Sequence, residues 1–306
     1  MKKAAILLLV ACILGFNFFA PVMAEESKEP AGLEITVLVD NNALIGKMLL
    51  SEPALSMLMK DGDKTILFDT GYSDATLKNA DALGYDLTKV DAIALSHGHF
   101  DHTVGLFYLA KYMRDHHIDK KIDLICHPDT FLPKDANGDF FGNILNEATL
   151  SQYFNIIKTS EPYQLTDNLT WLGEIERTFD FEEYTPTSKI FKDDEWVDDY
   201  LSEDTAIAYT NDEGVAVITG CSHAGICNIV DYAKKITGQE NVFDVIGGFH
   251  LLNPSEERMQ ATLDYFKELG VESIAPCHCV DLQARMTLNE SIPVREIGTG
   301  CVIELP

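Results

Sequence analysis

Short apolar runs bounded by polar residues predict many buried strands along this chain. Residues 33–39 alternate in polarity and are rich in β-branched side chains, as half-buried strands are. Two hairpins are expected around the turn sequences Asp61-Gly62-Asp63 and Asp212-Glu213-Gly214, which apolar runs flank on both sides. Further strands are predicted over residues 90–95, 122–126, 242–246, 273–275 and 294–305.

Helical periodicity appears between these strands. Ser73 is expected to cap a helix that ends at Gly84. Two more helices are predicted over residues 226–237 and 255–269, and the stretch 128–201 is polar and weakly periodic, which indicates loops, a short helix and some strands. A helix over residues 103–114 is expected to turn inward Val104, Leu106, Phe107, Ala110 and Met113.

Strands come in meanders, and the helices follow them without a Gly-, Pro- or Ser-rich linker. This order predicts one α+β domain, an αββα sandwich in which two packed mixed β-sheets carry helices on their outer faces. We expect this domain to span residues 25–306.

The first residues have the pattern of a secretory signal peptide. Lys2 and Lys3 precede an apolar run over residues 4–20, and small or apolar residues end at Ala24 before two glutamates. We predict cleavage after Ala24 and an exported protein, periplasmic or extracellular. An uncleaved anchor, or lipidation at Cys12, is the less favoured interpretation. No later run approaches the roughly 18 apolar residues that a membrane span needs.

Composition narrows the classes of partner. The 306 residues carry a formal net charge of −26, and an acidic surface repels phosphate backbones, so nucleic-acid binding is disfavoured. Seven cysteines are too few for a disulfide-built scaffold. We expect a small-molecule substrate, which can be anionic. The sequence does not predict the oligomeric state.

Candidate chemistry gathers where the predicted strand 90–95 ends. Residues 97–102 read His-Gly-His-Phe-Asp-His, and crowding three imidazoles and a carboxylate is costly without a metal. In an extended stretch His97 and His99 point the same way, and after a turn Asp101 and His102 offer a second set of donors. Imidazole nitrogen and carboxylate oxygen suit Zn²⁺, Fe²⁺ or Mn²⁺.

Two further histidines follow apolar strands in the same manner. His223 comes after the strand 215–219, and His278 after the strand 273–275. Because ligands from several strand ends converge on one edge of a sheet, both are predicted metal ligands. A buried histidine bonded to backbone is the alternative for each.

The hexapeptide resembles the HxHxDH motif of the metallo-β-lactamase fold superfamily. Later segments resemble the branch of 7,8-dihydropterin-6-yl-methyl-4-(β-D-ribofuranosyl)aminobenzene 5′-phosphate synthase. They are residues 173–177, 219–226, 247–251 and 276–279. The resemblance covers nearly the whole chain after the signal peptide.

By this resemblance, His97 and His99 would hold one divalent ion, and Asp101, His102 and His278 a second. Zinc is the metal most expected, with iron or manganese as alternatives. The superfamily usually has a bridging aspartate where this chain has Cys221. The resemblance therefore implies that His223, two residues on, replaces that donor.

Other residues are candidates for supporting roles. Asp101 can also serve as a catalytic general base, since carboxylates do so elsewhere. Asp69 is expected to orient a ligand loop. His250 and His127 follow apolar strands and are candidate substrate or supporting contacts, Arg177 is a candidate for an anionic group, and Cys221 is a further candidate ligand.

The chemistry predicted is hydrolysis of an ester, phosphoester or lactam by metal-bound hydroxide. A transfer like that of the resembled synthase is the alternative. A mono-iron redox enzyme and a non-catalytic metal-binding protein are further alternatives. Asp69-Thr70-Gly71 also matches the aspartic-protease tripeptide, but no second copy occurs to pair two carboxylates.

Overall fold

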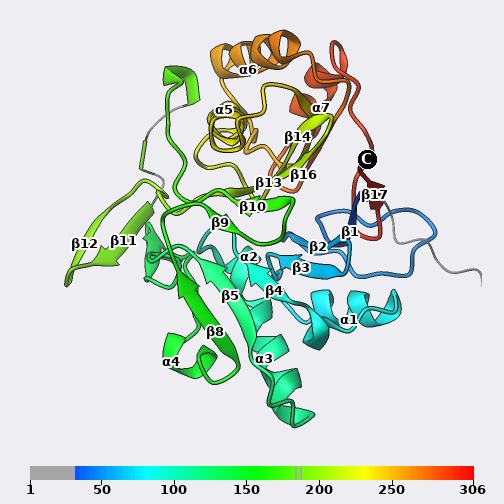
Figure 1. Cartoon of the computed structure of the whole chain (residues 1–306). Helices are drawn as coiled ribbons and strands as arrows, with labels where there is room; N and C mark the ends of the chain where they lie inside the picture. Colours follow the sequence, from blue (N-terminus) through cyan, green and yellow to red (C-terminus); the bar gives the residue numbers. More distant parts are fainter. Residues whose placement is uncertain (1–31, 183–184, 187) are drawn as a thin grey trace, which may run out of the picture.

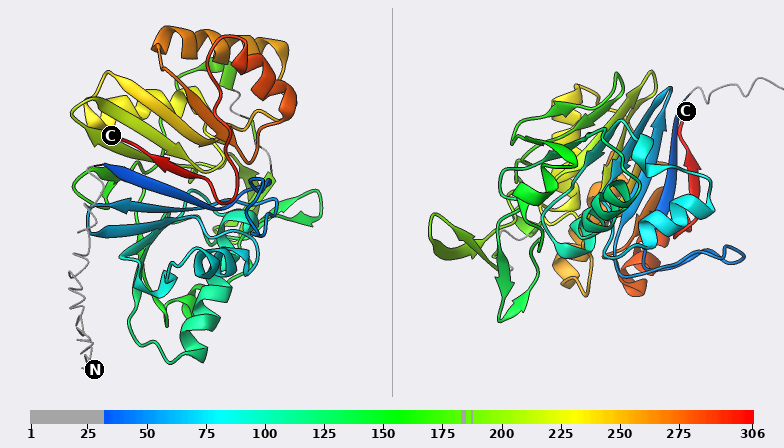
Figure 2. Two further views of the ribbon diagram at one scale, coloured as in Figure 1. Left: turned by 90° about the vertical axis from the view of Figure 1, so that its right-hand side faces the viewer. Right: turned by 90° about the horizontal axis from the view of Figure 1, so that it is seen from below.

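Two mixed β-sheets face each other and carry helices on their outer sides (Figures 1 and 2). The computed structural model describes residues 32–182, 185–186 and 188–306. The predicted signal peptide over residues 1–24 lies outside the described residues. Within them, no helix is long and apolar enough to cross a bilayer. The predicted αββα arrangement is confirmed.

The first sheet holds the amino-terminal half of the chain. Its strand order in the described residues is β17-β1-β2-β3-β4-β5-β8, antiparallel from β17 to β3 and parallel from β3 to β8. The strands are β1 (Leu33–Val39), β2 (Ser56–Asp61), β3 (Lys64–Phe68), β4 (Ala92–Ala94), β5 (Ile122–Cys126), β8 (Phe154–Lys158) and β17 (Val302–Glu304).

The second sheet holds most of the carboxyl-terminal half. Its order is β16-β15-β14-β13-β10-β9, with β14, β15 and β16 parallel. The strands are β9 (Tyr163–Gln164), β10 (Leu169–Trp171), β13 (Ala206–Asn211), β14 (Gly214–Thr219), β15 (Val242–Gly248) and β16 (Ile274–Cys277).

A third, small sheet stands out from this body. Its order is β12-β11-β6-β7, and β11 and β12 form the arm that projects in Figure 1. The sequence predicted strands in this stretch but not a separate sheet. Its strands are β6 (Lys134–Ala136), β7 (Asp139–Phe140), β11 (Ser188–Lys192) and β12 (Glu195–Asp199).

Helices cover both outer faces. On the first sheet lie α1 (Ala75–Ala82), η1 (Leu87–Lys89), α2 (Phe100–Thr103), α3 (Gly105–Asp115) and α4 (Glu147–Leu150). On the second lie η2 (Asp180–Glu182), α5 (Ile226–Thr237), α6 (Glu256–Leu269) and α7 (Leu282–Asn289). The predicted helices over 226–237 and 255–269 are confirmed, with Ser255 capping α6 through Arg258 N–H.

The buried apolar side chains form three layers that match this architecture. One layer fills the space between the sheets, with Ile35 and Phe68 from the first facing Trp171 and Ile218 from the second. A second layer lies under α5 and α6, and a third under α1 and α3. Burial of these faces is what stabilises the sandwich.

Several local predictions were wrong. Phe107 is 51% exposed, because the buried positions of α3 are 105, 106, 109, 110 and 113 and Phe107 lies off that face; Val104, Leu106, Ala110 and Met113 are buried as predicted. The N-cap position of α1 is Asp74 rather than Ser73, although the Ser73 hydroxyl still accepts from the N–H of Ala75, the first residue of the helix, at 3.1 Å and donates to Glu52. The strand expected over 294–305 is reduced to Val302–Glu304, and α7 was not predicted.

Trp171 joins the two sheets next to the candidate chemistry. Its ring is fully buried, and its Nε1–H donates to the carbonyl of Leu95, just after β4, at 2.9 Å. This bond fixes the strand end from which Ser96 and His97 follow.

We expect Trp171→Phe to lower the free energy of unfolding by about 2–4 kcal/mol, because it leaves a cavity and a buried carbonyl without its donor. Denaturant unfolding measures this difference. The matched control is Trp196→Phe, since Trp196 lies on the projecting arm and is about half exposed. Equal destabilisation by both changes would contradict the role given to Trp171.

Candidate metal centre

Strand ends from both sheets meet at one edge and carry the polar side chains of the site. From the first sheet, β3 leads into Asp69 and β4 into the segment that holds His97. From the second, β14 leads into Cys221, β15 into His250 and β16 into His278. This convergence confirms that the strand-end histidines share one place, apart from His127.

The backbone at these strand ends is strained. Asp69, Ser222, His250 and His278 have φ values of 56°, 66°, 49° and 55°, in the left-handed region that costs a non-glycine residue free energy. Each value turns the chain sharply at the end of a strand. Such strain persists only where surrounding contacts hold it, and here the contacts are those of the site.

His97, His99 and His223 form a first donor group. Their nearest ring nitrogens all lie within 4.8 Å of one another. His97 Nε2 and both nitrogens of His223 are buried and have no hydrogen-bond partner in the described part of the chain. Burial lowers the pKa of His97 and His223 well below the usual range and that of His99 to about 3. These rings are therefore neutral, with lone pairs available to a metal.

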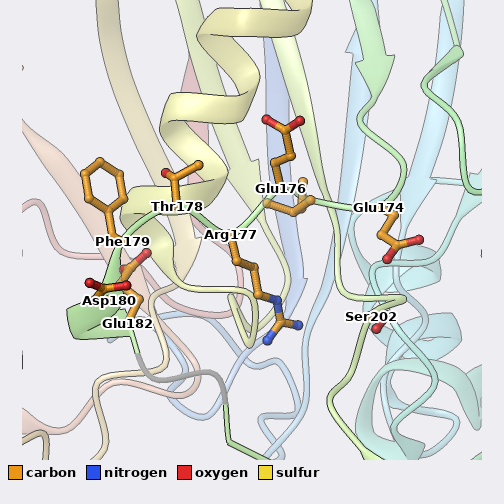
Figure 3. A pocket seen from close by; sticks show the side chains of 9 residues that line it. Glu174, Glu176, Arg177, Thr178, Phe179, Asp180, Glu182 and Ser202 are labelled. Carbon is orange, nitrogen blue, oxygen red and sulfur yellow. The ribbon is translucent and has the colours of Figure 1, made fainter.

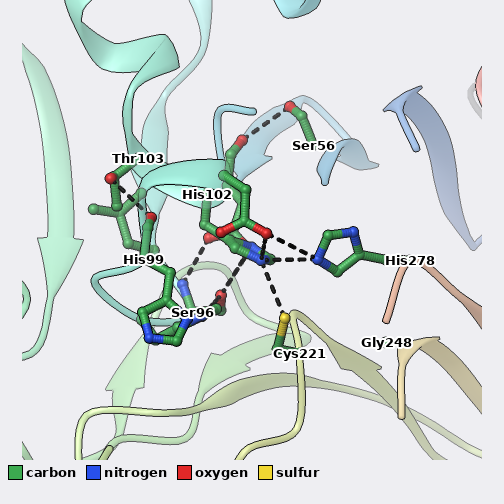
Figure 4. Close-up of polar contacts among 12 residues, drawn as sticks. Ser56, Ser96, His99, His102, Thr103, Cys221, Gly248 and His278 are labelled. Carbon is green, nitrogen blue, oxygen red and sulfur yellow. Dashed lines mark hydrogen bonds and ion pairs between the residues drawn. The ribbon is translucent and has the colours of Figure 1, made fainter. Parts of the chain in front are cut away.

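Asp101, His102 and His278 form a second group (Figure 4). His102 Nε2 lies 3.2 Å from His278 Nε2 and 3.5 Å from Asp101 Oδ2. The edge between His278 Nε2 and Asp101 Oδ2 is 3.3 Å. Ligands at about 2.0–2.1 Å around a tetrahedral ion stand roughly 3.3 Å apart, so this triangle has the dimensions of one face of such a site.

Asp69 orients both groups through one buried carboxylate. It accepts hydrogen bonds from Ser96 N–H at 2.8 Å, from Ser96 Oγ at 2.7 Å and from His102 Nδ1 at 2.6 Å. Because the Ser96 hydroxyl donates to Asp69, it accepts from His97 Nδ1 at 2.9 Å. Nε2 of His97 and Nε2 of His102 are then the ring nitrogens left to ligate a metal. A hydrogen bond at the other ring nitrogen is the support that metal-binding histidines usually have.

His278 is held by residues that the sequence reasoning missed. Asp40 accepts from its backbone N–H at 2.9 Å. Asn41 donates to its carbonyl at 3.0 Å, so Asn41 Oδ1 is the acceptor for His278 Nδ1 at 3.1 Å. Asp40 and Asn41 directly follow β1, and the rule that polar strand ends converge would have found them.

The charge balance of the second group favours a cation. Burial lowers the pKa of His102, but Asp101 and Asp69 outweigh it and raise that pKa to about 9. Burial raises the pKa of Asp101, yet the neighbouring His102 and His278 hold it below its usual range. Without metal, the proton on His102 therefore occupies the place that a divalent ion would take.

Cys221 and His223 are arranged differently from what the resemblance implied. His223 does not lie between the two groups; its ring centroid is 4.8 Å from those of both His97 and His99. Cys221 Sγ occupies the middle, 3.2 Å from His102 Nε2 and within 4.8 Å of a nitrogen of His97. Burial raises the pKa of this thiol.

Two supporting candidates, His250 and His127, differ in position. His250 lies at the site, with its ring centroid 4.2 Å from that of His223 and a buried Nδ1 that has no partner in the described residues. His127 accepts from Asp129 N–H at 3.1 Å, and its Nε2 lies 3.9 Å from Glu174. His127 belongs to none of the donor groups found in the described residues.

Arg177 lines a cavity of about 460 Å³ (Figure 3). Its guanidinium donates to the carbonyls of Tyr200 and Leu201 at 2.7 and 2.9 Å. Four acidic residues share the lining, Glu174, Glu176, Asp180 and Glu182. An acidic lining disfavours binding of an anion in this cavity. Contact of Arg177 with an anionic substrate is not tested and stays a prediction.

A further missed residue, Asp204, fixes the loop of His223. Its Oδ2 accepts from Ala224 N–H at 2.8 Å, and its Oδ1 is buried without a partner in the described residues. Burial raises the pKa of this carboxyl to about 7. No sequence pattern points to Asp204, because it lies before its strand in an acidic stretch.

Comparison with known proteins agrees with this geometry. A family model described as the metallo-beta-lactamase superfamily matches residues 51–119. The 7,8-dihydropterin-6-methyl-4-(beta-D-ribofuranosyl)-aminobenzene-5′-phosphate synthase of Methanocaldococcus jannaschii is 32% identical over 273 residues, covering 84% of this chain and 91% of the synthase. The chain belongs to the metallo-β-lactamase superfamily. Within it, the chain resembles the branch of this synthase, as expected.

Two further relatives extend the comparison. An uncharacterized protein of the same organism is 33% identical over 263 residues, with 84% of this chain and 94% of that protein covered. A crystal structure described as a metal-dependent hydrolase of the beta-lactamase superfamily is 28% identical and has a TM-score of 0.77. The match covers 89% of this chain and 99% of that chain.

We expect metal binding to release protons near neutral pH. His102 must lose its proton to bind metal, and its pKa of about 9 in the metal-free protein means that affinity rises with pH up to about that value. Calorimetric titration with Zn²⁺ in buffers of different ionisation enthalpy measures the protons released.

Asp69→Asn should reduce this proton release and weaken metal affinity by roughly 10–100-fold, since it removes the anion behind His102. Asp63→Asn is the matched control, because Asp63 is an exposed aspartate in the β2–β3 turn. Unchanged affinity in the Asp69 variant would show that its carboxylate does not support the ligands.

Proposed function

We propose that this chain is an exported metal-dependent hydrolase with a dinuclear centre. Zinc is the metal we favour, with iron or manganese as alternatives. The observation that carries the proposal is the pair of donor groups. Three neutral histidines, of which His97 and His223 have buried nitrogens without a partner in the described residues, stand beside an Asp-His-His triangle of tetrahedral dimensions. Buried lone pairs left without partners are costly unless a cation uses them.

Each residue has a role in this proposal. His97, His99 and His223 would hold one ion, and Asp101, His102 and His278 the other. Bound divalent ions polarise a substrate oxygen and lower the pKa of a bound water enough to supply hydroxide near neutral pH. Asp101 is ionised, because its pKa is lowered, and we assign it the acceptance of a proton from the attacking water.

The side from which substrate enters is set by burial. His97, His102, Cys221 and His278 are buried, whereas His99, Asp101, His223 and His250 are only partly buried. Solvent therefore reaches the site at Asp101 and at two of the three histidines in the first group. His250, beside His223, is positioned to contact a substrate there, and we propose that role for it.

Hydrolysis of an ester, phosphoester or lactam needs no second substrate and suits an exported protein. The similar crystal structure described as a metal-dependent hydrolase supports this choice. A synthase-like transfer is the second candidate, favoured by the relative that is 32% identical over most of both chains. Both use the same donors and differ in whether water or a second organic substrate attacks.

The metal centre makes a direct prediction. The chain purified without added metal should hold about two divalent ions, and His99→Ala should hold fewer. Hydrolysis of a phosphoester, ester or lactam panel should fall by more than roughly 100-fold, beyond the effect of losing a supporting contact. Elemental analysis and a rate assay measure these changes.

The control is His116→Ala, since His116 is an exposed histidine stacked on Tyr112 in α3. Full metal content in the His99 variant would remove His99 from the ligands. One iron per chain would favour the mono-iron redox alternative. Two ions without turnover of any panel member would favour a non-catalytic binding protein.

Labelled water separates hydrolysis from transfer. A hydrolase incorporates ¹⁸O from solvent into its product in the absence of any acceptor, as mass spectrometry detects. Turnover that requires an added amine or aryl acceptor, without ¹⁸O incorporation, would support the transferase instead.

Export has its own test. We expect the chain made in its native type of cell to begin at Glu25, because the signal peptide ends at Ala24. Intact mass and amino-terminal sequencing check this. A chain that keeps residues 1–24 in the membrane fraction would indicate an anchor.

A further inference from the structure

Two cysteines from different strand ends meet at the metal centre. Cys221 follows β14 and Cys279 follows β16, the strands on either side of β15. Sγ of Cys221, Sγ of Cys279 and a ring nitrogen of His278 all lie within 4.8 Å of one another. The Cys279 thiol donates to the carbonyl of Cys221 at 3.1 Å. Among the donor groups found in the described residues, this is the one that holds two sulfur atoms.

A glycine on the strand between them makes this contact possible. Gly248 ends β15, and its N–H donates to the carbonyl of Gly220 at 3.1 Å (Figure 4). A side chain at Gly248 would lie 2.8 Å from Cys279 Sγ and 3.2 Å from Cys221 Cα. The first of these distances is too short for a real Cβ contact, so any side chain there would displace the Cys279 sulfur. The two thiols are therefore neighbours across a strand end that carries no side chain.

Other cysteines of the chain have an ordinary role in the core. All six cysteines that the structure describes are free. Cys227 packs under α5, Cys277 packs between the two sheets, and Cys126 packs under α3. None of these three belongs to a donor group found in the described residues. Apolar packing accounts for them, whereas the sulfur atoms of Cys221 and Cys279 lie together at a polar site.

The Cys221 sulfur also stands among the nitrogens that would bind metal. It lies 3.2 Å from His102 Nε2 and within 4.8 Å of a nitrogen of His97 and one of His278. The thiolate is the form of cysteine that ligates metals, and a sulfur bonded to a second sulfur has no thiolate to offer. A metal ion bound to the thiolate would in turn keep this sulfur from an oxidant.

We propose that Cys221 and Cys279 are a reversible oxidation site: they form a disulfide in the metal-free chain, and this disulfide and metal binding exclude each other. The inference rests on the proposed function, since export would bring the chain into an oxidising environment where disulfides persist. It adds regulation to the same centre. Oxidation closes the centre to metal, and reduction opens it again.

The oxidant is a peroxide, which is small enough to enter a site that solvent reaches at Asp101. One thiol takes an oxygen atom from hydrogen peroxide and becomes a sulfenic acid, with release of water. The second thiol then attacks that sulfur, the S–S bond forms, and the sulfenic oxygen leaves as water with the proton of the second thiol. Two thiols and one peroxide thus give one disulfide and two waters, and two electrons pass to the peroxide. The two Sγ atoms must approach to about 2.05 Å, so both side chains rotate.

The test is the intact mass of the metal-free chain after treatment with a small excess of hydrogen peroxide. We expect a loss of about 2 Da that a phosphine reductant reverses. Zinc added before the peroxide should slow this loss by roughly tenfold or more, and the oxidised chain should bind zinc at least roughly tenfold more weakly until it is reduced. In the unmodified chain, the bond should join the tryptic peptides 193–234 and 268–285.

Four variants assign the bond to its two sulfur atoms. Each of the joined peptides holds a second cysteine, Cys227 in the first and Cys277 in the second. Cys227→Ser and Cys277→Ser are therefore the matched controls, and both should keep the mass loss and the joined peptides. Cys221→Ser and Cys279→Ser should each abolish them.

Three results would overturn the proposal: oxygen adducts without the loss of about 2 Da, a mass loss that survives Cys221→Ser or Cys279→Ser, and equal rates of oxidation with and without zinc. Failure of the proposed function is distinguishable, because it appears as a fully reduced chain that binds no zinc. The mutual exclusion then falls with the proposed function, whereas the disulfide itself is still read from the mass of the metal-free chain.

Discussion

The carboxylate of Asp69 is the constraint on which the site depends. It is completely buried, and it holds the backbone and hydroxyl of Ser96 and the imidazole of His102 at 2.6–2.8 Å. A buried carboxylate without partners would be very costly, so the segment after β4 must approach it closely. Gly220 allows the second sheet to approach as well, since a side chain there would lie 2.2 Å from Ser96 Oγ. The two sheets therefore approach each other closely at the Asp69 carboxylate.

The sandwich supplies the other half of this arrangement. Trp171 from the second sheet bonds the carbonyl of Leu95 in the first, so the sheets are joined by a polar contact at the site and by apolar packing elsewhere. Strained residues at the ends of β3, β14, β15 and β16 then turn the chain sharply beside the site. The cost of this strain is offset by the core and, in the proposed function, by the metal that the donors would bind.

The two donor groups of the proposed metal centre differ in burial and in charge. The Asp101, His102 and His278 group is supported by Asp69 and Asn41, is largely buried, and carries the negative charge. The histidine group around His99 is neutral and partly open to solvent. Cys221 lies between them, at the place where the superfamily usually has aspartate. A softer donor there favours zinc or iron over manganese.

The sequence alone determined the elements and the identity of the donors. Apolar patterns placed β1, β5, α5 and α6 to within a residue or two, because each element buries apolar side chains in the core: the strands on both faces, the helices on one. The spacing of His97, His99, Asp101 and His102 indicated metal chemistry, because that density of donors has little other use. Local pattern failed at Phe107, an apolar side chain that lies off the buried face of α3.

Only the tertiary structure decided how the donors are shared. His223 and Cys221 are two residues apart, yet across the left-handed turn at Ser222 His223 lies beside His97 and His99, whereas Cys221 also approaches His102. The supports Asp40, Asn41 and Asp204 come from distant segments. Residue type and spacing determine the local secondary structure and the ligand chemistry of each segment. Long-range packing of the strand ends determines which side chains come into contact.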